Sequence, residues 1–167
     1  MFSIDISIKR EGREPPPLVT EYNNDQESYL IELLDLFDEQ GLLSFEVSGF
    51  GLEWPVTITD LSTILYELKG VICSLRNRNS TEIFFYEQSI ARYILIEPKQ
   101  NSVVILSCVD FNRKVIAGAA AETTTVSELS KMLENFLSKF VMKSYILCPK
   151  LKENTIYQSW IGQLLLE

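Results

Sequence analysis

Histidine is absent from the 167 residues of this chain. Because histidine is the commonest general base and metal ligand in proteins, its absence excludes Ser-His and Cys-His nucleophile pairs and histidine-bound metals. Cysteine is scarce, since Cys73, Cys108 and Cys148 are widely spaced and form no CxxC pair. We therefore expect three small buried thiols rather than disulfides or a zinc site. We predict no catalytic residue, no bound metal and no cofactor.

A long apolar segment is also lacking. No run of apolar residues approaches the roughly 20 that a membrane-spanning helix needs. Residues 1–5 do not contain the basic and apolar regions of a secretory signal. We therefore expect a cytoplasmic protein that does not bind membranes.

The length and composition fit a single folded domain over residues 1–167. Hydrophobic residues make up 46% of the chain and charged residues 23%, as in ordinary globular proteins. Residues 10–20 include three consecutive prolines, which restrict the backbone and remove hydrogen-bond donors. We expect a proline-rich loop over these residues.

Basic side chains are missing from a long part of the chain, because no lysine or arginine lies between Arg13 and Lys69. Residues 1–60 hold 13 acidic and 3 basic side chains, whereas residues 61–167 hold 10 acidic and 12 basic ones. An acidic surface repels phosphate backbones and anionic lipids, so nucleic acid and membrane surfaces are poor partners. A basic protein is the favoured partner on electrostatic grounds.

Apolar periodicity predicts an α+β fold, in which an antiparallel β-meander is covered by three to four helices. A period of two predicts strands at 2–9 and 42–48, and helical spacing predicts helices at 25–40, through Leu61–Leu75, at 125–142 and at 155–166. Four further strands are expected at 82–87, 91–97, 102–110 and 114–119. The short connections between these four strands require antiparallel hairpins.

The helix expected at 25–40 has one strongly acidic face. Its apolar residues share the opposite face, apart from Ile31, which lies on the polar side. The acidic face carries Glu32, Asp35, Asp38 and Glu39. It is either an ordinary solvated surface or a docking surface for a basic partner. Concentrated like charge reduces stability through self-repulsion, and a basic partner would relieve that repulsion, so both interpretations stay open.

Two aromatic residues, Phe50 and Trp54, lie in a glycine-containing loop beside Glu53. They are either anchors in a protein interface or plugs in the core, because large aromatics serve both purposes. The candidate partner-binding residues are Glu32, Asp35, Asp38, Glu39, Phe50, Glu53 and Trp54. An enzyme would instead need carboxylates such as Glu53, Asp60, Glu82 or Glu87 to meet in a cleft.

The acidic run Glu21–Asp60 and the order of helices and meander resemble those of bacterial toxin-immunity proteins. This resemblance concerns the general character of the whole chain and transfers no functional residue. It implies a non-catalytic, acidic, cytoplasmic inhibitor that neutralises a basic toxin or nuclease by masking its active site.

A second hypothesis is a structural or assembly subunit that self-associates, such as a phage or secretion component. The amphipathic strand at 2–9 would then pair with a second copy across a two-fold axis, because an edge strand presents unpaired backbone groups. The sequence leaves the oligomeric state open, and a dimer is compatible with it.

Overall fold

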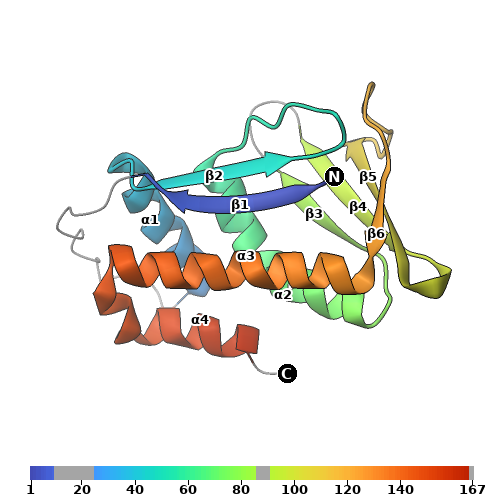
Figure 1. Ribbon diagram of the computed structural model, residues 1–167. Helices are drawn as coiled ribbons and strands as arrows, with labels where there is room; N and C mark the ends of the chain where they lie inside the picture. Colours follow the sequence, from blue (N-terminus) through green and yellow to red (C-terminus); the bar gives the residue numbers. More distant parts are fainter. Residues whose placement is uncertain (10–24, 86–90, 166–167) are drawn as a thin grey trace.

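The computed structural model describes residues 1–9, 25–85 and 91–165 of the chain. The expected α+β fold is confirmed (Figure 1). The proline-rich loop predicted at 10–20 and Glu87 lie outside the described residues. The elements are β1(Ser3–Ile8), α1(Gln26–Glu39), β2(Leu43–Ser48), α2(Ile58–Arg76), β3(Thr81–Phe85), β4(Arg92–Pro98), η1(Gln100–Ser102), β5(Val103–Asp110), β6(Glu122–Thr125), α3(Val126–Leu147), η2(Pro149–Lys152) and α4(Thr155–Leu165).

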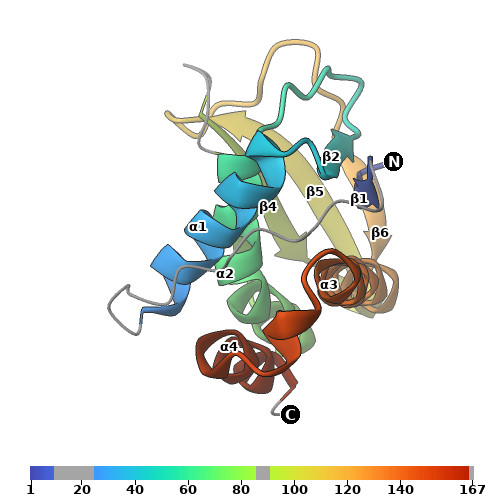
Figure 2. The same cartoon turned by 90° about the vertical axis from the view of Figure 1, so that its left-hand side faces the viewer.

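The expected meander is a four-stranded antiparallel sheet in the order β3-β4-β5-β6. Its inward-facing side chains, among them Ile83, Ile94, Ile96 and Leu106, are buried. Figure 2 shows the helices on one side of this sheet. Helix α2 packs on β3, and α1 and α3 pack on α2, so the core lies between the sheet and these helices.

Strands β1 and β2 form a separate two-stranded antiparallel sheet, in which Ile4 is opposite Val47 and Ile6 is opposite Phe45. In β1 the isoleucines 4 and 6 are buried, whereas Ser3, Asp5 and Ser7 are exposed. This is the burial that a period of two predicts. The buried side of β1 packs against α3 (Figure 1).

Gly49, which follows β2, packs closely against Phe2, which precedes β1. A Cβ atom at Gly49 would lie 2.7 Å from the Cα of Phe2, and Gly49 has a φ of +135°. Only glycine combines this φ with such a close approach between two backbones. Gly70 interrupts the helical pattern of residues 61–75, and a glycine inside a helix indicates close packing against a neighbour. This prediction is wrong, because a Cβ atom at Gly70 would meet nothing within 4 Å.

Capping boxes open α2 and α3. The hydroxyl of Thr57 accepts from the N–H of Asp60, and the hydroxyl of Thr125 accepts from the N–H of Glu128. The sequence predicts Thr57 or Thr59 as the cap of α2 and a capping box from Thr125 to Glu128 at the start of α3. The structure selects Thr57 for α2 and confirms the box of α3. Helix α3 ends at Leu147, beyond the expected end at residue 142, because helical packing continues through this buried residue until Pro149.

The strand expected at 114–119 is wrong. Val115 forms only an isolated bridge with Val109, and the fourth strand of the meander is β6. Residues 117–121 are alanine and glycine, which have low β-propensity, whereas β6 contains three consecutive β-branched threonines.

The helical spacing of the tail predicts that Tyr157 and Trp160 pack in the core, and both residues of α4 are buried. Cys108 and Cys148 are buried, but Cys73 is only partly buried, which corrects that part of the cysteine prediction. No helix within the described ranges has the length and hydropathy needed to cross a membrane.

Candidate protein-binding surface

Helix α1 presents the predicted acidic face to solvent. Asp25 is the N-cap of α1, because its carboxylate accepts hydrogen bonds from the N–H groups of Glu27 and Ser28. The buried side consists of Tyr29, Leu30, Leu33, Leu34 and Phe37. With these five residues facing the core, the helical period directs the acids outward: Asp35, Asp38 and Glu39 are exposed and Glu32 is partly exposed.

The carboxylates on α1 repel one another. Partial burial raises the pKa of Asp35, and the neighbouring charges of Glu39 and Asp38 raise this pKa further. In the described part of the chain, none of the four carboxylates forms an ion pair. Asp38 and Glu39 also lie in the last turn, which contains no basic residue and where the helix dipole is negative. The negative charge of the acidic face therefore lowers the stability of the free domain.

An apolar side chain lies in the middle of this face. Ile31 is 41% exposed. It is one helical turn from Glu27 and from Asp35, and two turns from Asp38. An apolar residue surrounded by charged ones has the arrangement of an anchor inside a polar rim. Ile31 is not among the partner-binding residues predicted above, although the sequence carries a signal for it, because an apolar residue interrupts the polar side of an amphipathic helix.

Phe50 is corrected as a candidate anchor, because its side chain is 0% exposed. Its ring packs on the rings of Phe2 and Trp54, each at a centroid distance of 5.9 Å. Its backbone N–H donates to the carboxylate of Glu122 at 2.6 Å. Of the two interpretations of this residue, the structure supports a plug in the core.

Trp54 is partly exposed, but its contacts are intramolecular. Its indole N–H donates to the carbonyl of Gly49 at 3.1 Å, and its ring lies 4.9 Å from the ring of Phe85. The guanidinium of Arg92 lies 5.4 Å from the centroid of the indole ring. Arg92 also donates to the carbonyl of Glu53, whose side chain is exposed. Trp54 therefore holds the loop against one end of the sheet.

The structure separates the predicted residues into two places. Trp54 and Glu53 lie at the end of the sheet where Phe85 and Arg92 are found. Asp38 lines a different hollow, of about 440 Å³, with Lys9, Ser44 and residues 57–59 at the start of α2. Of the predicted residues, the four acids of α1 lie together on one helix, and the structure adds the exposed Ile31 to them. We call these five residues the acidic α1 face.

A second group of acids extends the negative charge toward the sheet. Burial raises the pKa of Glu67 on α2, and the charges of Glu82 and Glu27 raise it further. Glu82 is ion-paired with Arg113, so it is partly neutralised. The sequence does not indicate that Glu27 and Glu67 belong together, because no local pattern shows that residues on two helices approach each other.

The carboxylates considered for catalysis have structural partners or lie apart. Asp60 is buried and caps α2, and Glu82 pairs with Arg113. Burial raises the pKa of the Cys108 and Cys148 thiols, so both are protonated at neutral pH. Across residues 1–9, 25–85 and 91–165, no three acidic or cysteine side chains are grouped closely enough to hold a metal.

Comparison of the chain with protein-family models, with curated protein sequences and with solved structures finds no significant match.

Proposed function

We propose that this chain is a non-catalytic protein-binding domain whose acidic α1 face docks a basic protein. The observation that carries the proposal is an exposed Ile31 on a helix face with four carboxylates and no basic residue in its last turn, where the charges of Glu39 and Asp38 add to burial in raising the pKa of Asp35. A basic partner would relieve this repulsion, so binding would recover stability that the free domain lacks.

The partner class that fits this chemistry is a basic toxin or nuclease, in keeping with the resemblance to bacterial immunity proteins. A nuclease must attract phosphate, so the surface around its active site is positive. An acidic helix face with one apolar anchor is complementary to such a surface. The carboxylates would accelerate association, and Ile31 would contribute contact area once the complex has formed.

The test starts with a pulldown from native lysate, which supplies a basic candidate for kinetic measurements. Association with this candidate is then compared for the unmodified chain and for the double variant Asp35→Lys/Asp38→Lys. We expect the association rate to fall by about tenfold or more and its dependence on salt to weaken, because steering is electrostatic. The variant Ile31→Ala should chiefly raise the dissociation rate.

The matched control is Glu46→Lys/Glu153→Lys, because both glutamates are exposed and lie off α1. This control changes the net charge by the same amount. Equal slowing in both double variants would show that only net charge matters, and no slowing in either would show that the acidic α1 face is not used. Each of these results contradicts the proposal.

A further inference from the structure

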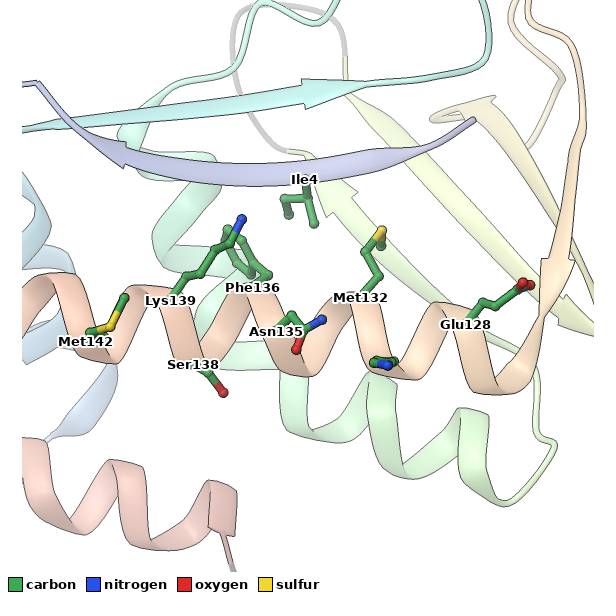
Figure 3. A pocket seen from close by; sticks show the side chains of 9 residues that line it. Ile4, Glu128, Met132, Asn135, Phe136, Ser138, Lys139 and Met142 are labelled. Carbon is green, nitrogen blue, oxygen red and sulfur yellow. The ribbon is translucent and has the colours of Figure 1, made fainter.

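Helix α3 carries two exposed apolar side chains near its end. Met142 is 55% exposed and Ile146 is 56% exposed, whereas every other apolar residue of this helix is buried or partly buried. The two residues lie one helical turn apart. Figure 3 shows Met142 beside Lys139 on α3, next to a groove of about 560 Å³ that both residues line. Apolar side chains that stay exposed together mark an interaction surface more often than isolated ones do.

These two residues belong to a helical hole. On a helix, positions i, i+3, i+4 and i+7 surround a hole that receives one side chain from a facing helix. In α3 this set is Lys139, Met142, Lys143 and Ile146. Lys150 lies three residues beyond the helix, in η2, which packs on α3. We call these five residues the basic α3 end. Its hole fits an apolar side chain that has carboxylates as neighbours.

The basic α3 end stays positive after the acids beside it are counted. The ammonium of Lys139 donates to the carboxylate of Asp5 at 2.8 Å, and the charge of Lys143 also acts on Asp5. In the part of the chain that the structure describes, neither Lys143 nor Lys150 forms an ion pair. The opposite charges at 152 and 153 cancel. Three lysines therefore face one carboxylate.

The acids of α3 itself do not offset this charge. Glu128 lies in the first turn of the helix, where its carboxylate accepts hydrogen bonds from Thr125 in the capping box. Glu134 forms an ion pair with Arg76 of α2 at 3.2 Å. Both are thus held away from the end of the helix, which remains a basic surface on a chain of net charge −8.

The acidic α1 face has the complementary pattern. Ile31 is 41% exposed, and Glu27 and Asp35 lie about 6 Å along the helix axis on either side of it. Residues four positions apart form one ridge on a helix, and such ridges pack into the grooves of another helix. With Ile31 in the hole between Met142 and Ile146, these carboxylates would lie beside the lysines of the basic α3 end. Apolar and charged groups would then both be matched.

We propose that the acidic α1 face of one copy docks on the basic α3 end of a second copy. Figure 2 shows α1 and α3 on opposite sides of α2, and both helices pack on α2. The two surfaces therefore lie apart on one copy, so the contact is head-to-tail and each copy keeps one surface free for another. Few apolar side chains are buried in this contact. The dissociation constant is therefore high, at about 0.1 mM.

This contact goes beyond the proposed function, because it assigns a role to α3 and requires no other protein. It also predicts competition. A basic protein that docks on the acidic α1 face would displace the second copy, because both use the same carboxylates. At high concentration the free chain would thus keep its acidic α1 face covered.

Sedimentation velocity of the full chain, from about 10 µM to about 1 mM, tests the proposal. We expect the average mass to rise from 19.1 kDa past twice that value, and to decrease when salt screens the complementary charges. Association through apolar surfaces alone would instead strengthen with salt, because salt screens the repulsion of the net charge of −8. That result overturns the proposal, as does a mass of 19.1 kDa at every concentration.

Reversal of charge identifies the two surfaces. Lys143→Glu/Lys150→Glu and Asp35→Lys/Asp38→Lys should each weaken association by at least about tenfold, because each places like charges opposite one another. A chain that carries all four substitutions has exchanged the two charges and should associate again. If association is lost in both double variants but is not restored in the combination, the two surfaces do not meet and the proposal is wrong.

Lys114→Glu/Lys131→Glu is the matched control, because both lysines are exposed and lie outside the basic α3 end. It changes the net charge as much as Lys143→Glu/Lys150→Glu does and should affect association far less. Equal weakening would show that only net charge matters, which contradicts the proposal. Circular dichroism checks the folding of each variant. Lys143→Glu/Lys150→Glu leaves the acidic α1 face intact and should still bind the basic candidate from the pulldown, so failure of the proposed function is recognised separately.

Discussion

The carboxylate of Glu122 accepts a hydrogen bond from the backbone N–H of Phe50 at 2.6 Å. The same carboxylate also accepts from the N–H of Phe2, so one side chain at the start of β6 connects the meander with the end of the β1-β2 sheet at which β1 begins and β2 ends. The side chain of Glu122 is only 14% exposed, which limits the access of water to these bonds.

Replacing Glu122 with alanine should therefore destabilise the fold. Glu122→Ala leaves two amide groups without their acceptor, and we expect the free energy of unfolding to fall by about 2–3 kcal/mol. Urea denaturation followed by circular dichroism measures this change. Glu46→Ala, at an exposed position on β2, should change the free energy of unfolding by less than about 0.5 kcal/mol. A similar loss in both variants would contradict the role of Glu122.

Tyr29 makes stability sensitive to alkaline pH. Burial raises the pKa of its hydroxyl to about 12, and this oxygen has no hydrogen-bond partner among the described residues. The unfolded chain releases this proton near pH 10, whereas the folded chain retains it to about pH 12. Between these values the folded state binds more protons, so its stability decreases as pH rises, by roughly 1.4 kcal/mol per pH unit.

Tyr29→Phe removes this contribution. Between pH 10 and pH 12, unfolding free energies of the variant should fall less steeply than those of the unmodified chain. At neutral pH the variant should be as stable or slightly more stable, because it removes a buried hydroxyl without a partner. Parallel slopes for the two proteins would show that Tyr29 does not contribute.

Gly70 offers a simple way to stabilise α2. It lies inside the helix, and a Cβ atom there would meet nothing within 4 Å. We expect Gly70→Ala to raise the free energy of unfolding by about 0.5–1 kcal/mol, because alanine loses less backbone entropy on folding. Gly41→Ala is the control: Gly41 has equal space but a φ of +61°, so alanine should destabilise it. Thermal unfolding of both variants distinguishes backbone entropy from packing.

Asp35 should show opposite effects on stability and on binding. Because the pKa of Asp35 is raised in the folded state, the ionised carboxylate opposes folding at pH values above that pKa. Asp35→Asn removes its repulsion with Glu39 and Asp38, and we expect a gain of about 0.5 kcal/mol at neutral pH. The gain should shrink as pH falls and Asp35 in the unmodified chain becomes protonated, and association with the basic partner should slow. A lower free energy of unfolding in Asp35→Asn would contradict the charge repulsion inferred for the acidic α1 face.

The elements of this fold were predictable wherever neighbours in the sequence decide the structure. Alternation identified β1, and the capping box of Thr125 and Glu128 marked the start of α3, whereas the cap of α2 stayed open between Thr57 and Thr59. The exposure of the acids on α1 also followed from the sequence, because the opposite face of that helix is apolar. In each case a few residues within one or two turns carry the information.

Only the tertiary structure decided which strands pair and which aromatic side chains are covered. Phe50 became a core residue because Phe2 and Glu122, both remote in sequence, approach it, and Ile31 remained exposed because nothing described packs there. The fourth strand of the meander is β6 and not residues 114–119. The threonines of β6 have a higher β-propensity than the alanine and glycine residues at 117–121. Burial and strand pairing depend on contacts between residues that are distant in the sequence, and local periodicity does not predict these contacts.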